Sequence, residues 1–286
     1  MKLKLVQRLA ISYYKAKFQF LSIFSNRKAA ASVFDLFCTP YSGKPKRKAP
    51  AIFSKAEVLN FSFEGMTLYG WRWNPDQPNG KKILIVHGFD SCSYRFDRYI
   101  VPLNKQGFEV IAFDAPAHGM SGAKRINALQ YSNAIKAIDE KYGIFYGIMA
   151  HSLGGLATAL AFEQLPQQEK RKLVLIAPTT ETSTAIDNFF RFIPVNKKVQ
   201  AEFHKVIEEV GQRPISYYSV ARAVQNIQAP VLWIHDEEDK VCPYCDTIPV
   251  QEKQLSHVEF FITKGLGHSG IYRQDTVFKK IIEFFS

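Results

Sequence analysis

The chain has few cysteines and no long hydrophobic run. Its 286 residues include four cysteines, at positions 38, 92, 242 and 245. A chain of this length can bury a large core, so these thiols need not form a disulfide framework. The longest uncharged stretch near the N-terminus, residues 18–26, is too short to span a bilayer, and basic residues interrupt any secretory signal. We therefore expect reduced thiols in a cytoplasmic protein.

The sequence also lacks the motifs of nucleotide-dependent enzymes. It contains neither G-x-x-x-x-G-K-[ST] nor a dinucleotide fingerprint, and we expect no cofactor. The segment Cys242-Pro243-Tyr244-Cys245 has the spacing of a redox motif or of half a zinc site. Because two further zinc ligands cannot be identified, we interpret this pair as loop thiols and expect no metal.

Acidic residues are scarce at the N-terminus. The chain carries a formal charge of +11, but residues 1–50 hold eleven basic residues and one acidic residue, Asp35. Residues 51–286 are therefore nearly neutral, and the charge belongs to an N-terminal arm. We expect no nucleic-acid binding, because neither a known nucleic-acid-binding fold nor interleaved aromatic residues accompany this charge.

The arm has the periodicity of a basic amphipathic helix. Apolar residues recur at three- and four-residue spacing, namely Val6, Leu9, Tyr13, Ala16, Phe20 and Phe24. Lys4, Arg8 and Lys15 fall on another face. A second helical stretch is expected around 29–37, and the polar, Pro- and Lys-rich segment 41–50 is expected to be a linker.

Three interpretations of this arm stay open. Its apolar stripe could pack on the main domain, it could contact an anionic membrane peripherally, or it could be a disordered tail. The first is favoured. The second is consistent with the arm's amphipathic helix and polybasic linker, which are the two signals that stable surface binding requires.

The main domain, residues 51–286, alternates strand-like with helix-like segments. The strand-like segments are 58–65, 66–73, 82–88, 108–115, 146–152, 172–178, 231–236 and 258–265. The first two predict a hairpin, and the other six are apolar on both faces, which is typical of a parallel sheet covered by helices. The interval 179–229 is too long for an ordinary connection and predicts a helical cap. The fold class is therefore α/β, with a mostly parallel, doubly wound sheet.

The segment YGIMAHSLGG, residues 146–155, suggests a nucleophile. A serine hydroxyl is a poor nucleophile unless a sharp strand-to-helix turn presents it to a base, and small flanking residues let that turn close. Ser152 lies at such a point, with Gly154 after it and Ala150 in place of the usual first glycine. The alternative is a serine that only caps the helix.

From these residues the chain resembles the α/β-hydrolase family over about residues 58–286. The family carries an H-G segment after an early strand, here His87-Gly88. The resemblance implies an oxyanion hole formed by the backbone N–H groups of Phe89 and Leu153. The segment 114–121, DAPAHGMS, matches a family loop with Ala117 in place of a glycine, and we expect its role to be structural.

The resemblance also implies an acid and a base in the order Ser, Asp, His. Four acidic residues follow the strand 231–236, and the spacing to Val241 and Pro243 favours Asp239, with Asp236 as the alternative. The base is expected to be His268, in the loop before the last helix.

The favoured function is hydrolysis of a small-molecule carboxylic ester through an acyl-enzyme. A thioesterase or an acyltransferase would use the same triad, and a non-catalytic scaffold that retains the fold is the alternative of another class. Aromatic residues of the cap suggest an apolar acyl or aryl substrate, or else form the cap's own core. They are Phe189, Phe190, Phe192, Phe203, Tyr217 and Tyr218. The sequence does not define an oligomeric state.

Overall fold

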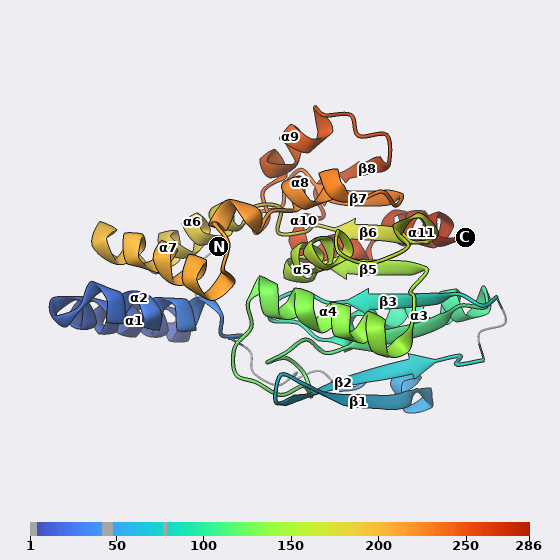
Figure 1. Cartoon of the computed structure of the whole chain (residues 1–286), viewed down its shortest axis with the longest axis horizontal. Helices are drawn as coiled ribbons and strands as arrows, with labels where there is room; N and C mark the ends of the chain where they lie inside the picture. Colours follow the sequence, from blue (N-terminus) through green and yellow to red (C-terminus); the bar gives the residue numbers. More distant parts are fainter. Residues whose placement is uncertain (1–4, 42–47, 77–78) are drawn as a thin grey trace. The chain divides into compact units, whose positions relative to one another are not determined.

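The computed structural model describes residues 5–41, 48–76 and 79–286, which form two compact units (Figure 1). In the first, here called the helical unit, the described part of Met1–Thr39 joins Glu181–Tyr218. The second, the sheet unit, combines Pro40–Thr180 with Ser219–Ser286. The helical unit thus unites most of the predicted arm with the middle of the predicted cap interval.

The sheet unit is built on one eight-stranded sheet. Its strands are β1 (Glu57–Phe63), β2 (Met66–Trp73), β3 (Lys82–Val86), β4 (Glu109–Phe113), β5 (Gly147–His151), β6 (Lys172–Ile176), β7 (Val231–Asp236) and β8 (Val258–Thr263). Their order across the sheet is β1-β2-β4-β3-β5-β6-β7-β8. The β1–β2 hairpin and the β2–β4 pair are antiparallel, and every other pair is parallel. Each strand overlaps one of the predicted segments, and the predicted fold class is confirmed.

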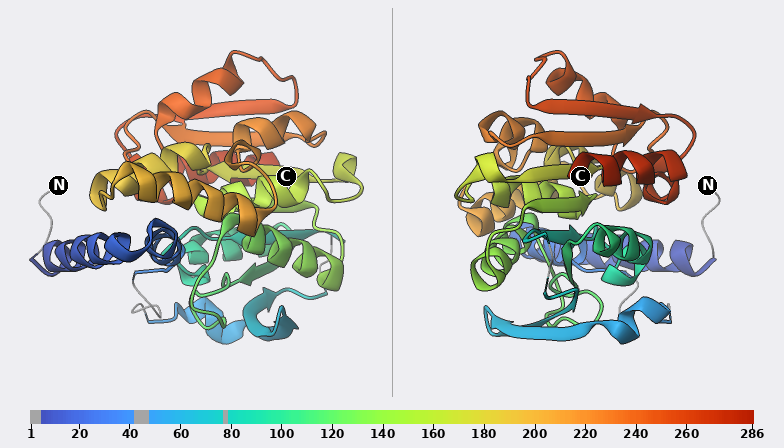
Figure 2. Two further views of the ribbon diagram at one scale, coloured as in Figure 1. Left: turned by 60° about the vertical axis from the view of Figure 1, so that its left-hand side comes forward. Right: turned by 90° about the vertical axis from the view of Figure 1, so that its right-hand side faces the viewer.

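Helices cover both faces of this sheet. They are α3 (Asp97–Lys105), α4 (Ala128–Tyr142), α5 (Leu153–Phe162), α8 (Val220–Ala223), α9 (Ile248–Gln251), α10 (Gly267–Gly270) and α11 (Asp275–Phe285). Figure 2 shows α4 and α5 on one face and α3 and α11 on the other. All residues of β4, β5 and β7 are buried as a result, which explains why these strands are apolar on both faces.

Local signals set the ends of α4. The Asn127 side chain accepts a hydrogen bond from the Gln130 amide and so satisfies one of the free N–H groups at the start of the helix. Gly143, with a φ of 86°, ends the helix in a conformation that suits glycine. Asn127 and Gly143 thus mark the two ends of the helix.

The helical unit contains four helices and a short 3-10 turn, Ile215–Tyr217, among its described residues. The helices are α1 (Leu5–Phe24), α2 (Asn26–Phe37), α6 (Thr182–Phe192) and α7 (Lys197–Gly211). A buried apolar cluster holds them together, and its members include Phe18, Val33, Phe189 and Phe203. The ring of Phe37 lies 5.2 Å from that of Phe189 and 5.7 Å from that of Phe203, between ring centroids.

The packing of α1 differs from the expected one. Its buried side carries Ile11, Tyr14, Phe18 and Leu21, whereas the predicted apolar stripe, which includes Leu9 and Phe20, is exposed. The physical reason is that α1 has a second apolar face, which is the one that meets the cluster.

The predicted linker 41–50 includes residues 42–47, which lie outside the described residues. The main domain was expected to begin near residue 51, and a 3-10 helix begins there, over Ala51–Lys55. None of the helices in the described ranges is long and apolar enough to cross a bilayer.

Candidate active site

Ser152 lies at a strained turn between β5 and α5. Its φ of 56° and ψ of −125° are unusual for any residue with a side chain, and such strain persists only where the surroundings enforce it. The Ser152 amide donates to the Ile176 carbonyl at 3.1 Å, and its carbonyl accepts from the Gly155 amide at 2.9 Å. This geometry presents the serine side chain beyond the carboxyl end of the parallel strands.

Close packing explains which small residues the turn requires. A Cβ atom added at Gly154 would lie 2.3 Å from the His87 carbonyl oxygen, and one added at Gly88 would lie 2.7 Å from the Cβ of Ser152. Neither the backbone carbonyl of His87 nor the Cβ of Ser152, which is fixed to the backbone, can yield to such contacts, so these two positions need glycine. Ala150, in contrast, is accommodated within the core, so the missing first glycine of the motif is tolerated.

His268 and Asp239 lie beside the serine. The Ser152 hydroxyl is 2.9 Å from His268 Nε2, and His268 Nδ1 is 2.8 Å from Asp239 Oδ2. His268 belongs to α10, just after β8, and Asp239 follows the end of β7. The structure therefore brings together the three residues that the sequence singled out, in the hydrogen-bonded order Ser, His, Asp.

The environment keeps Asp239 ionised. Burial alone would raise the pKa of its carboxyl, but the hydrogen bond and charge of His268, together with two backbone amides, outweigh burial and lower that pKa. These are the amides of Val241 and Cys242, which donate to Asp239 Oδ1 at 2.8 and 2.9 Å. Asp239 Oδ2 thus accepts the hydrogen bond from the His268 imidazole.

The Asp239 carboxylate in turn affects the pKa of His268. Burial alone would lower the pKa of the imidazole, but the interactions with the Asp239 and Cys242 side chains together outweigh burial and raise the pKa above its ordinary value. A basic imidazole that accepts from the serine hydroxyl at Nε2 can remove its proton. This arrangement can therefore generate a serine nucleophile.

Asp236, the alternative acid, has other partners. Its two carboxylate oxygens accept hydrogen bonds from the amides of Glu238, Leu266 and Gly267 and from the hydroxyl of Thr263. Burial raises its pKa, but these bonds lower it by more, so the carboxylate is ionised. Through these hydrogen bonds, Asp236 links the segment that carries Asp239 to the start of α10, which carries His268.

The two amides expected to form an oxyanion hole flank the serine. Leu153 opens α5, so its N–H has no acceptor within the helix. Phe89 follows Gly88, whose α-carbon faces the Ser152 side chain at close range. Across the described ranges of the chain, neither amide donates to a protein acceptor. These two N–H groups therefore stay the candidates for an oxyanion hole.

Two buried histidines support the Phe89 segment. His87 donates from Nδ1 to the Gly88 carbonyl at 2.8 Å and accepts at Nε2 from the Ala115 amide at 2.9 Å. His118 accepts at Nε2 from the Asp90 amide at 2.9 Å and lies, through Nδ1, 2.9 Å from the Pro116 carbonyl. Burial lowers the pKa of each to about 4, so both rings are neutral.

Ala117, in the same 114–121 loop, replaces the glycine that the family pattern has. It adopts a φ of 65°, in the left-handed region that glycine occupies without strain. Ala117 N donates to the Gly122 carbonyl at 2.6 Å, and His118 N donates to the Ala115 carbonyl at 3.0 Å. The loop therefore keeps its shape with an alanine at this position, and His118 positions the Phe89 segment rather than touching Ser152.

Sequence reasoning missed one residue, His151. Its ring centroid lies 4.7 Å from that of His268, and its Nε2 donates to the His268 carbonyl at 3.1 Å. Burial lowers its pKa to about 3, so it stays neutral beside the base. The feature of the sequence that could have identified His151 was its position immediately before Ser152, at the buried end of β5.

The two cysteines after Asp239 differ in their surroundings. Cys242 is buried, its Sγ lies 3.6 Å from Thr179 Oγ1, and its carbonyl accepts from His235 Nε2. Cys245 is exposed. No group of three or more metal-ligating side chains occurs among the described residues. The Cys242 side chain also interacts with His268 and, after Asp239, helps to raise the pKa of that imidazole.

The chain is similar to known hydrolases. A family model described as serine aminopeptidase, S33, matches residues 77–217. The uncharacterised hydrolase YugF of Bacillus subtilis is 26% identical over 151 residues, which span 48% of this chain and only 53% of that protein. A putative esterase/lipase of Mycoplasma pneumoniae is 22% identical over 237 residues, or 71% of this chain and 88% of that protein.

Solved structures share the fold. An esterase of Pyrococcus furiosus superposes with a TM-score of 0.61 at 18% identity, covering 85% of this chain and 96% of the esterase. At this identity the likeness concerns the fold. Taken with the strand order around Ser152, it shows that the chain has the α/β-hydrolase fold.

Proposed function

We propose that the chain is a serine hydrolase that cleaves carboxylic esters through an acyl-enzyme intermediate. The observation that carries the proposal is the hydrogen-bonded series Asp239–His268–Ser152, with distances of 2.8 and 2.9 Å. A structural serine that only caps a helix needs no buried base and no carboxylate behind it. Ser152 has both, and its side chain makes no capping hydrogen bond to α5.

The reaction follows from the positions of the protons. Ser152 Oγ attacks the ester carbonyl while its proton passes to His268 Nε2, and the resulting imidazolium is stabilised by Asp239. His268 then returns this proton to the leaving alcohol, which departs and leaves an acyl group on Ser152. A water molecule gives its proton to His268 and attacks the acyl carbonyl, and the carboxylic acid leaves as Ser152 is reprotonated.

Negative charge on the former carbonyl oxygen needs donors that are already in position. We expect the N–H groups of Phe89 and Leu153 to be these donors, because each residue follows a segment that contacts or contains Ser152. Removing one such donor in other hydrolases costs roughly 10²–10³ in kcat. No side-chain donor is required at this position.

The substrate is proposed to carry an apolar acyl or aryl group. Support comes from the relatives whose names include esterase or lipase. The cap aromatics give less support than their number suggests, because Phe189 and Phe203 are buried in the core of the helical unit. A thioester or an acyl acceptor other than water would fit the same triad and has to be distinguished by assay.

The test is labelling by a fluorophosphonate, which reacts with an activated serine, followed by a substrate panel. The wild-type chain should be labelled and Ser152→Ala should not. A chain that is folded by circular dichroism but unlabelled would overturn the proposal and favour a scaffold role. The panel should contain matched p-nitrophenyl esters and acyl thioesters of increasing chain length. Faster turnover of every thioester than of its matched ester would reassign the activity to a thioesterase.

A further inference from the structure

Helix α1 has an apolar face that nothing in the described chain covers. Its residues are Leu5, Val6, Leu9, Tyr13, Phe20, Ile23 and Phe24, which are between 61% and 77% exposed. With about 100° of rotation per residue, all seven fall within a sector roughly 100° wide, and they extend about 28 Å along the helix. Isolated exposed apolar residues are common, but a continuous strip of this size marks an interaction site.

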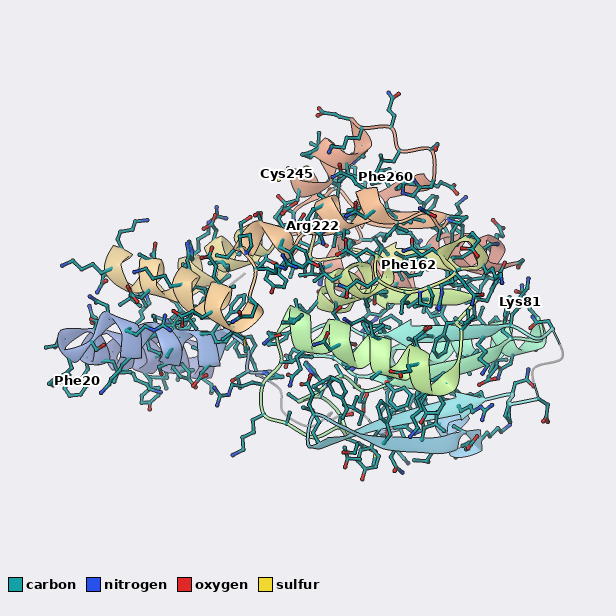
Figure 3. All side chains as sticks on the ribbon, viewed as in Figure 1. Phe20, Lys81, Phe162, Arg222, Cys245 and Phe260 are labelled. Atoms are coloured by element: carbon teal, nitrogen blue, oxygen red, sulfur yellow. The ribbon has the colours of Figure 1, made fainter. Side chains whose placement is uncertain are left out.

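This face is distinct from the one that holds α1 in the helical unit. The packed side chains, among them Tyr14 and Phe18, project roughly 150° around the helix from the exposed strip. Figure 3 labels Phe20, which lies on the side of the helix pair away from α7, and its ring meets that of Phe24 at 5.2 Å. The strip therefore remains available while α1 stays docked.

Basic residues border the strip on both edges. Arg8 and Lys15 lie along one edge and are exposed, and Lys17 lies along the other, with its Nζ 6.0 Å from the centroid of the Tyr14 ring. Helix α1 contains no acidic residue. Long basic side chains can place their charge at a polar surface while their methylene groups follow an apolar one.

We propose that this strip binds the surface of an anionic lipid bilayer, with α1 lying in the plane of the interface. An apolar strip bordered by lysine and arginine matches both layers of such a surface, the acyl region and the negative headgroups. A second copy of the chain fits less well. Pairing two α1 strips would bring Arg8, Lys15 and Lys17 of both copies together without any acid on the helix to offset them.

The charge of the whole segment points the same way. Residues 1–50 carry eleven basic residues and one acidic residue, and the rest of the chain is nearly neutral. Each basic residue near an anionic membrane contributes about 1 kcal/mol of attraction, and salt screens that attraction. Binding should therefore depend on anionic lipid and on ionic strength.

The experiment is co-sedimentation of the full chain with vesicles of phosphatidylcholine alone or with 30% phosphatidylserine, at low and moderate salt. The wild type should bind only the anionic vesicles and should be partly released by salt. Leu9→Gln/Phe20→Gln should lower the partition coefficient at least tenfold. Arg8→Gln/Lys15→Gln/Lys17→Gln should lower it roughly a hundredfold, about fivefold for each residue.

Matched controls replace other exposed residues, which lie outside α1. Val58→Gln/Met120→Gln removes two exposed apolar side chains, and Lys105→Gln/Lys124→Gln/Lys279→Gln removes three exposed charges. Both controls should bind like the wild type, and all variants should retain their circular dichroism and fluorophosphonate labelling. Controls that lose binding as much as the α1 variants would overturn the proposal.

Two other results would also overturn it. One is a wild type that ignores anionic vesicles at low salt or binds neutral ones equally well. The other is a dimer in sedimentation equilibrium that Leu9→Gln/Phe20→Gln converts to monomer, because the strip would then be a self-association surface. Loss of catalysis in Ser152→Ala with intact vesicle binding would separate this inference from the proposed hydrolase activity.

Discussion

Each of the two units is stabilised internally by a different kind of contact. Around Ser152 in the sheet unit, buried polar groups are joined by hydrogen bonds, such as those that Asp236 and His118 accept. The helical unit is held by aromatic and aliphatic packing around residues such as Phe203, and one side of α1 stays uncovered. Catalytic geometry thus depends on directional bonds, whereas the helical unit tolerates an open apolar face.

The largest loss of activity should come from substitutions in the triad. Ser152→Ala and His268→Ala should each lower kcat/KM for an ester by about 10⁴-fold or more, because both act in the same step. The double variant should be little slower than either single variant. Steady-state kinetics on a p-nitrophenyl ester measures all three, and losses that add on a logarithmic scale would argue against a shared unit.

The next largest effect should separate the two buried aspartates. Asp239→Asn should lower kcat by about 10³–10⁴-fold, because the amide favours the wrong tautomer of His268. Asp236→Asn should cost less in kcat but should lower the melting temperature more, because it weakens four hydrogen bonds, two of which reach the segment before His268. Kinetics and thermal melts of both variants provide the test. A larger loss of kcat in Asp236→Asn would make Asp236 the acid.

The pH profile should reveal the influence of Asp239 on His268. Only the neutral imidazole accepts a proton, so kcat/KM should rise with pH through the pKa of His268 in the free enzyme. Because the hydrogen bond that His268 donates to Asp239 helps to raise that pKa, the midpoint should lie above the ordinary histidine value of about 6.5. Asp239→Asn should move the midpoint to lower pH. A wild-type midpoint below 6.5 would contradict this assignment.

A smaller effect is expected from the support of the Phe89 segment. His118→Ala removes the acceptor for the Asp90 amide, so the neighbouring oxyanion donor should be less well positioned. We expect kcat to fall about tenfold with little change in KM, since the donor acts on the transition state. His257→Ala is the control, because that ring bonds to the Val224 carbonyl. Equal losses in both variants would indicate general destabilisation.

The smallest effect on chemistry should come from the helical unit. Deleting residues 1–39 removes Phe18 and Val33 from the apolar cluster and should lower soluble yield. Protein that stays soluble should still be labelled by a fluorophosphonate within about twofold of the wild-type rate, since the triad lies in the sheet unit. Labelling kinetics measures this rate. A tenfold slower rate would show that the arm contributes to the site.

The sequence predicted the parts of the site whose signals are local. Ser152 stands between a buried strand and a helix, and His268 follows the last strand, so spacing and chain order identified both. The bonds of Asp236 to Leu266 and Gly267 could not be foreseen, because they join loops thirty residues apart through backbone amides. Any residue type can supply such an amide.

Periodicity likewise found that α1 is amphipathic but not which apolar face packs. The stripe through Leu9 and Phe20 and the packed face through Tyr14 and Phe18 both have helical spacing. Only the positions of the neighbouring helices distinguish them. The same ambiguity applied to the cap aromatics, and Phe189 and Phe203 proved to be core residues of the helical unit.

The bonds of Asp236 have a consequence for local opening. The amides of Glu238, Leu266 and Gly267 all donate to one carboxylate, so an opening that releases one of them exposes the others to solvent as well. In hydrogen–deuterium exchange these three amides should therefore share one protection factor. The same opening would carry Asp239 and His268 apart, so that their shared exchange rate also reports how often the catalytic series is interrupted.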